Sequence, residues 1–252
     1  MIEIFLLSIV QGITEFLPVS SSSHLVLVSE YFEFQNQSLS IDVSLHIGSF
    51  IAVLSYFYKD IIDFYKNKTL FLNVLVSSIP TILVGFLIVE LNYIDKIRNP
   101  EIIACTTIFF AIFLYLSDKS KINNNIENNF NFKSAISIGM LQILSLLPGV
   151  SRSGIAITAA RFLRFGRVEA AKISFLLSIP ILGAVSVFGL KNILISENSL
   201  FTKTNLMAIF LSFSFSFITI KFFLNFLKKF NLNFFVLYRI LLGIIILLYL
   251  KL

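Results

Sequence analysis

The chain has 252 residues, of which 57% are apolar and 13% are charged, and it carries a formal net charge of +6. Because a soluble domain contains about 25% charged residues and fewer apolar ones, this composition excludes an ordinary soluble domain and predicts a polytopic membrane protein. The basic residues cluster between apolar runs, where they act as topology signals and contact acidic lipid headgroups. We therefore expect membrane lipid, and not nucleic acid, as a partner.

The apolar runs follow one order twice along the chain. Two short runs broken at a proline come first, at 1–17 and 19–33, followed by three runs long enough to span a bilayer, at 43–58, 69–93 and 101–117. After a loop, a second short pair lies at 134–147 and 151–165, followed by spanning runs at 170–190, 202–227 and 233–251. Proline pushes the residue before it out of the helical region, so each short pair is predicted to form a re-entrant helix hairpin.

The two hairpins are related by an internal repeat. At an offset of 131 residues, four residues of the first hairpin match the second: Gln11 with Gln142, Val19 with Val150, Ser20 with Ser151 and Ser22 with Ser153. Each hairpin precedes three spans, an odd number, so the second copy must enter from the opposite side. We expect an all-α membrane protein of six transmembrane helices plus two re-entrant hairpins in an inverted-topology repeat. Residues 1–252 form a single integral membrane domain, with repeat one at 1–117, a loop at 118–133 and repeat two at 134–252.

The basic residues predict the orientation of this repeat. Twelve of the 20 Lys and Arg fall on the side opposite the mouth of the first hairpin. Five fall on the same side as that mouth, namely Lys96, Arg98, Lys191, Lys203 and Lys251. Since cytoplasmic loops carry the excess of positive charge, the first hairpin, 1–33, should open outward and the second, 134–165, inward. Both tips then lie near the midplane.

Each tip begins a helix, and together the tips favour an anion. Ser20 and Ser151 are expected N-caps, each followed by free backbone N–H groups at the positive end of a helix dipole. Arg152 adds a fixed charge and a planar fork suited to phosphate oxygens. A guanidinium near the midplane costs about 2.5–3.5 kcal/mol on insertion scales, so it should have an anionic partner. A plain ion pair with Glu15 is the alternative to phosphate binding.

The first hairpin carries groups suited to catalysis. Gln11 and Glu15 share one helical face at i, i+4, where they could bind a hard divalent cation such as Mg²⁺ or Ca²⁺. Glu15 could instead be a general base or the counter-ion of Arg152, and Gln11 a helix–helix hydrogen-bonding residue. His24 could exchange a proton with a neighbouring serine hydroxyl or simply pack. His46 is interpreted as cavity-lining or interfacial.

Besides Arg152, two cations lie inside apolar runs, Lys221 and Arg239. We interpret both as snorkelling to the membrane surface or packed at helix ends.

Two motifs resemble the undecaprenyl-diphosphate phosphatase family of the bacitracin-resistance type. The (E/Q)xxxE element running into a serine-rich stretch is present as Gln11-xxx-Glu15 followed by Ser20–His24, and the PGxSRSxxT element as Pro148–Ser153. The sequence departs from the family pattern at three positions: Ser23 replaces a common Gly, Ala156 replaces the final Thr, and Gln11 is the alternative to Glu.

The resemblance implies hydrolysis of undecaprenyl diphosphate to undecaprenyl phosphate and inorganic phosphate, which recycles the lipid carrier of peptidoglycan and other cell-wall polymers. It further implies a divalent cation and a multi-pass protein of the bacterial cytoplasmic (inner) membrane, with an active site open to the periplasmic side. By position, Arg152 and the tip serines, Ser20, Ser22, Ser151 and Ser153, would bind the polyprenyl diphosphate. Glu15, with or without Gln11, would hold the cation or activate the nucleophile, and His24 would shuttle a proton. Ser21 is the candidate nucleophile, with a directly attacking water as the rival.

A transporter is the alternative from another functional class. A lipid-phosphate flippase or anion transporter would use the same midplane site, with Arg152 and the helix dipoles. It would not require Ser21 and His24, so the Glu–Ser–His cluster favours the phosphatase. The oligomeric state stays open, a homodimer included.

Overall fold

The computed structural model describes residues 2–32, 34, 38–91, 99–195 and 202–250. Of the residues assigned above to runs and outer loops, Met1, Glu33, Asn92, Tyr93, Lys96, Arg98 and Lys251 lie outside these ranges. The described residues form helices and turns, with one isolated bridge between Asn124 and Phe165. The all-helical prediction is therefore confirmed for this part of the chain.

Five of the described helices are long and apolar enough to cross a membrane. They are α3 (Leu39–Tyr56), α5 (Lys68–Glu90), α7 (Pro100–Asp118), α11 (Arg167–Ile195) and α12 (Lys203–Leu227). The sixth predicted run forms α13 (Asn233–Tyr249), an apolar helix of 17 residues. Together these helices define a multi-pass membrane protein.

The remaining helices are short. They are α1 (Ile2–Thr14), α2 (Ser21–Tyr31), α4 (Tyr58–Asp63), α8 (Ile126–Asn129), α9 (Phe132–Gln142), the 3₁₀ turn η1 (Ile143–Leu146) and α10 (Arg152–Phe162). The predicted loop at 118–133 thus contains one short helix, α8. The two prolines interrupt α1–α2 and α9–α10 as predicted, although α1 ends earlier than expected, so Glu15 lies in the break.

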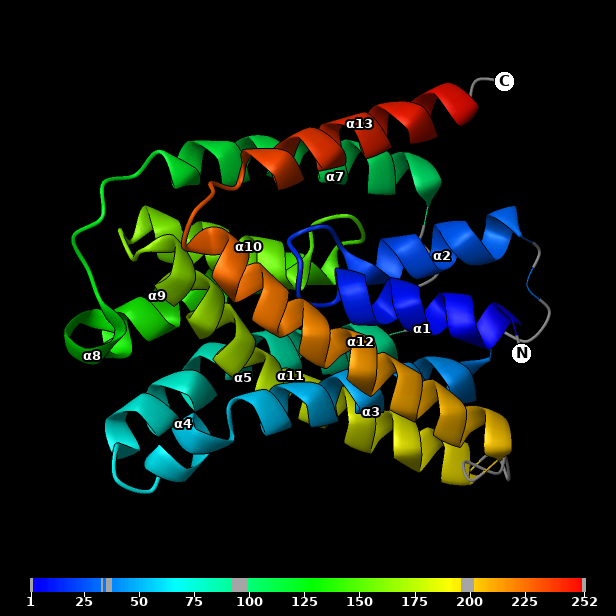
Figure 1. The fold of residues 1–252 in the computed structure, drawn as a ribbon, viewed down its shortest axis with the longest axis horizontal. Helices are drawn as coiled ribbons and strands as arrows, with labels where there is room; N and C mark the ends of the chain where they lie inside the picture. Colours follow the sequence, from blue (N-terminus) through cyan, green and yellow to red (C-terminus); the bar gives the residue numbers. More distant parts are fainter. Residues whose placement is uncertain (1, 33, 35–37, 92–98, 196–201, 251–252) are drawn as a thin grey trace.

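The two helix breaks meet in the interior of the bundle. Figure 1 shows α7 and α13 side by side along one edge and α3 and α11 along the opposite edge, with α12 crossing obliquely between them. α10 packs against α7, α9 and α11, whereas α1 packs against α2, α3 and α12. Each break ends in a residue of positive φ, Ser20 at 73° and Ser151 at 72°. Non-glycine residues rarely adopt this conformation, so the surroundings must hold it in place.

A separate buried ion cluster lies at the C-terminal end of α10. Arg161 is 1% exposed and donates to the backbone carbonyls of Phe165, Asp118 and Ser120, the last two at 2.9 and 2.6 Å. Arg167 binds the Asp118 carboxylate with two hydrogen bonds, at 2.6 and 3.0 Å. This cluster ties the end of α7 to the connection between α10 and α11.

Small residues allow α3 and α12 to approach closely, as is usual between membrane helices. A Cβ at Gly48 would collide with the backbone carbonyl oxygen of Ile209. Next to it, the Ser49 hydroxyl lies 3.2 Å from that of Ser212 and 3.0 Å from that of Ser216. These helices cannot separate without losing buried hydrogen bonds.

We expect Gly48→Ala to destabilise the protein by about 1–3 kcal/mol, because the added methyl group must push two helix backbones apart. The thermal midpoint in detergent, followed by size-exclusion chromatography after heating, would measure the loss. Gly183→Ala in α11 is the control, since its Cβ would meet only the Phe50 ring at 3.4 Å. Equal midpoints for the two variants would contradict the close approach of α3 and α12.

Candidate active site

Glu15 is the centre of the candidate site. Its buried carboxylate pairs with Arg152 of α10, with Arg152 Nη2 2.6 Å from Glu15 Oε1. The other oxygen, Oε2, accepts hydrogen bonds from Gln11 Nε2 at 3.0 Å and from the Ser21 hydroxyl at 2.6 Å. One carboxylate therefore joins a guanidinium from the second hairpin to a hydroxyl and an amide from the first.

The serines of the two tips take different positions. Ser151 is the N-cap of α10, as predicted, and its hydroxyl accepts from the Gly154 N–H at 3.1 Å. The Ser153 hydroxyl donates to the Leu17 carbonyl at 2.6 Å and so links the tips directly. Ser20 precedes α2 directly, with its hydroxyl 3.0 Å from that of Ser23, while Ser22 is exposed on the first turn.

Two buried polar atoms of the site have no hydrogen-bond partner among the described residues: Arg152 Nη1 and Gln11 Oε1. Buried polar atoms are nearly always paired, and an unpaired one costs about 1–3 kcal/mol or more when charged. The site therefore keeps one cationic donor and one neutral oxygen acceptor available for a ligand. A phosphate oxygen would satisfy the donor.

His24 is buried, and both of its ring nitrogens have partners. Nδ1 lies 2.6 Å from the Ser20 carbonyl oxygen, and Nε2 lies 2.6 Å from the Tyr238 hydroxyl. A carbonyl only accepts, so Nδ1 carries the hydrogen and Nε2 is the basic nitrogen facing Tyr238. The Ser21 hydroxyl donates to Glu15 instead. Glu15, rather than His24, is thus placed to take a proton from Ser21.

Helix α13 contributes two residues that the sequence interpretation did not assign to the site, Tyr238 and Arg239. The prediction that Arg239 snorkels or packs at a helix end is wrong, because it lies in the middle of α13 and is 1% exposed. The signal for it was a lone arginine inside an apolar helix. Lys221 is exposed on α12, and half-buried His46 on α3 has its Nδ1 2.7 Å from the Asp42 carbonyl oxygen.

The donor set for a divalent cation is small. Glu15 provides one carboxylate, already bonded at both oxygens, and Gln11 provides one unpaired amide oxygen. In the part of the chain that the structure describes, no group of three or more His, Cys, Asp or Glu residues could hold a metal ion. These residues fit a hard cation that takes most of its oxygen ligands from elsewhere.

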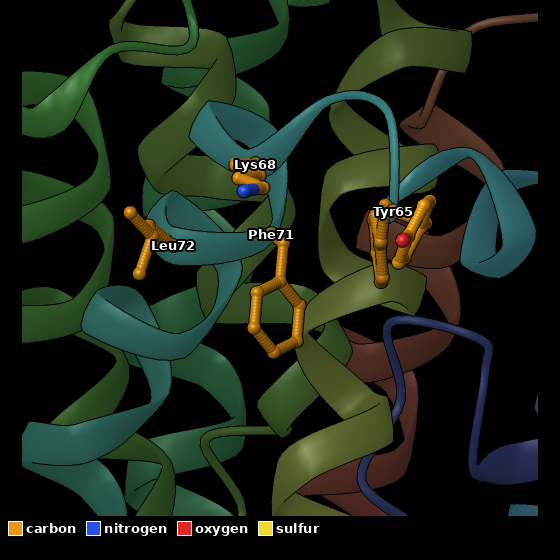
Figure 2. Close-up of a pocket in the computed structure, with 5 residues that line it drawn as sticks. Tyr65, Lys68, Phe71 and Leu72 are labelled. Carbon is orange, nitrogen blue, oxygen red and sulfur yellow. The ribbon is translucent and has the colours of Figure 1, made fainter.

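A separate hollow of about 450 Å³ lies where α4 leads into α5 (Figure 2). Its lining is aromatic and aliphatic, with Lys68 as its charged group: Phe64, Tyr65, Lys68, Phe71 and Leu72. None of the residues around Glu15 lines it. Its lining has no carboxylate beside a serine, in contrast to the hairpin tips.

Fold and site together define a multi-pass helical membrane protein that holds an acid, a hydroxyl and a guanidinium where two helix breaks meet. The family model described as bacitracin resistance protein BacA matches residues 4–245. The chain belongs to this family, which confirms the resemblance seen in the two motifs.

Curated relatives match along almost their whole length. The undecaprenyl-diphosphatase of Pelagibacter ubique is 50% identical over 246 residues, covering 97% of this chain and 96% of that protein. Proteins of the same name from Elusimicrobium minutum and Campylobacter curvus are 43% and 39% identical, covering 96% and 98% of this chain and 95% and 97% of their own lengths.

Glu15→Gln should destabilise the protein by about 3 kcal/mol, because it leaves the Arg152 guanidinium, 13% exposed, without a counter-charge. Lys172→Gln removes an ion pair with Asp60 whose side chains are 36% and 27% exposed. That change should cost at most about 1 kcal/mol. Thermal midpoints in detergent compare the two, and an equal or smaller shift for Glu15→Gln would argue against the buried pair.

Proposed function

We propose that this chain hydrolyses undecaprenyl diphosphate to undecaprenyl phosphate and inorganic phosphate. The observation that carries the proposal is the Ser21 hydroxyl, 2.6 Å from a carboxylate that is itself paired with Arg152. The names of the relatives support the same reaction. The activity is that of a membrane hydrolase that recycles the lipid carrier of cell-wall polymers and confers bacitracin resistance.

The polyprenyl diphosphate is bound between the two tips. Arg152 Nη1, which has no hydrogen-bond partner in the described part of the chain, donates to a phosphate oxygen. The N-termini of α2 and α10 add backbone N–H groups and the positive ends of two helix dipoles. The prenyl chain lies along the apolar flanks of the hairpins, in lipid.

Ser21 is the nucleophile in this proposal. Its oxygen attacks the terminal phosphorus while its proton passes to Glu15 Oε2, and the bond from that phosphorus to the bridging oxygen breaks to release undecaprenyl phosphate. A water molecule then attacks the phosphoserine, giving inorganic phosphate and restoring the serine. Arg152 stabilises the charge on the phosphoryl oxygens in both steps.

The cation and the histidine have supporting roles. Glu15 and the unpaired Oε1 of Gln11 would hold Mg²⁺ or Ca²⁺, which supplies charge neutralisation of the diphosphate when bound. His24 shuttles a proton near the tip, with Tyr238 as its hydrogen-bonding partner. A transporter would use Arg152 and the tips without a Ser21–Glu15 contact, and none of the relatives named above supports that alternative.

Purified protein should release phosphate from a polyprenyl diphosphate in the presence of divalent cation. Ser21→Ala, Glu15→Gln and Arg152→Ala should each lower kcat by about 10²–10⁴-fold, because each removes a nucleophile, a base or a charge from the transition state. Ser137→Ala is the control, since its exposed hydroxyl donates to Lys133 within α9.

Acid quenching with substrate labelled in the terminal phosphate should trap label on Ser21. Full activity in Ser21→Ala would favour direct attack by water. No phosphate release by wild-type protein, or full activity in Arg152→Ala, would overturn the assignment of the site.

The proposed topology is six spans and two re-entrant hairpins in an inverted repeat, set in the bacterial inner membrane. The equivalent positive-φ serines at the two breaks support the repeat. The excess of basic residues opposite the mouth of the first hairpin supports a site open to the periplasm. The substrate then reaches the site from the outer leaflet.

Cysteine labelling would test this topology in a Cys105→Ser background. Asn125→Cys in the loop at 118–133 should react only with a membrane-permeant reagent, because the loop is cytoplasmic. Lys203→Cys at the start of α12 is exposed and should react with an impermeant reagent from the periplasm. Periplasmic labelling at position 125 would contradict the inverted repeat.

A further inference from the structure

Arg239 is a buried cation that the proposed reaction does not use. It lies midway along the apolar helix α13, and its side chain is among the largest fully buried ones in the described chain. Charged side chains inside a membrane protein are costly, so they are retained where they perform a specific task.

The guanidinium of Arg239 binds backbone rather than acid. Nη1 donates to the Pro18 carbonyl at 3.3 Å, and Nη2 donates to those of Gly149 and Val150 at 2.9 and 3.1 Å. Nε donates to the Thr107 carbonyl of α7 at 3.3 Å. In the part of the chain that the structure describes, no carboxylate is among its hydrogen-bond acceptors. One side chain therefore contacts both hairpin tips and the helix beside them.

The contacted carbonyls occupy equivalent positions in the two repeats. Pro18 and Gly149 are related by the same offset of 131 residues that relates Ser20 to Ser151. Each lies two residues before a serine of positive φ, at 73° and 72°. Arg239 thus sits between the two copies and holds the same carbonyl of each.

This contact also orients a peptide at the phosphate-binding end of α10. The described residues contain no cis peptide bond, and in a trans peptide the C=O and N–H groups point in opposite directions. The Val150 carbonyl points at Arg239, so the Ser151 N–H points away from it. Gly154 allows the close packing, since a Cβ there would lie 2.9 Å from Arg239 Nη1.

We propose that Arg239 is a positioning residue for the phosphatase reaction. It holds the Ser21–Glu15 half of the site in register with the Ser151–Arg152 half and fixes the direction of the Ser151 N–H. The inference rests on the proposed function, because the register of the tips matters only if both act on one diphosphate. A shorter cation with a single ammonium cannot reach the carbonyls of both tips together.

The test measures kcat and KM of Arg239→Lys per mole of folded protein, in the wild-type and the Arg152→Lys backgrounds. In the wild-type background kcat should fall at least about 30-fold with KM within about threefold, because displacements of about 1 Å cost that much. In the Arg152→Lys background the same change should lower kcat less than about threefold, since residues acting as one unit are not additive.

Arg161→Lys is the matched control for structural damage. Arg161 is equally buried and donates to three backbone carbonyls, against four for Arg239, but at the far end of α10. Arg161→Lys should lower the thermal midpoint yet change kcat of the folded enzyme less than about threefold. If Arg239→Lys does not fold, Gly154→Ala replaces it in the same cycle, because a Cβ at position 154 would lie 2.9 Å from Arg239 Nη1 and 3.1 Å from the Ser151 side chain.

Equal effects of Arg239→Lys and Arg161→Lys on kcat, or equal effects of Arg239→Lys in both backgrounds, would overturn the positioning role. If Gly154→Ala is used instead, an equal fall in kcat in the wild-type and the Arg152→Lys backgrounds would also overturn the positioning role. A wild-type protein without phosphatase activity would instead refute the proposed function.

Discussion

The hairpin tips place a carboxylate, two guanidinium groups and two stretches of non-helical backbone inside an apolar helix bundle, and the structure depends on pairing them. Apolar surroundings make each of these groups expensive unless it is paired. The contact between Glu15 and Arg152, at 2.6 Å, pairs two charges that neither hairpin could hold alone. Each hairpin therefore supplies the counter-charge for the other, and the candidate site forms where the two breaks meet.

The surrounding helices supply the remaining hydrogen bonds. α7 donates to the second tip through Thr106 and Thr107, whose hydroxyls reach the Pro148 and Gly149 carbonyls at 2.5 and 3.3 Å. α13 adds Arg239, which contacts both tips, and Tyr238, which binds His24. α7 and α13 lie side by side (Figure 1), and these hydrogen bonds to the tips add to the apolar packing between the two helices. Among the described residues, Arg152 Nη1 has no hydrogen-bond partner, which is consistent with the proposed phosphate binding.

Much of this arrangement could be predicted from local patterns. Composition indicated a membrane protein, the prolines marked both helix breaks, and the serine before Arg152 predicted the N-cap of α10. The cost of a lone buried guanidinium predicted an anionic partner for Arg152, with Glu15 as one of the alternatives. The partners of His24 and Arg239 could not be predicted, because Tyr238 is 214 residues from His24 and the direction of a side chain on α13 depends on tertiary packing. For the same reason, Arg239 was interpreted as a helix-end residue, and the assignment of its contacts required the fold.

The most direct test of the two-hairpin site is an experimental structure in lipid with a non-hydrolysable methylene analogue of a polyprenyl diphosphate. The terminal phosphorus should lie about 3–3.5 Å from Ser21 Oγ, the distance expected for attack, with a phosphoryl oxygen hydrogen-bonded to Arg152 of the other hairpin. A diphosphate contacting only one hairpin, or bound in the hollow between α4 and α5, would contradict the account.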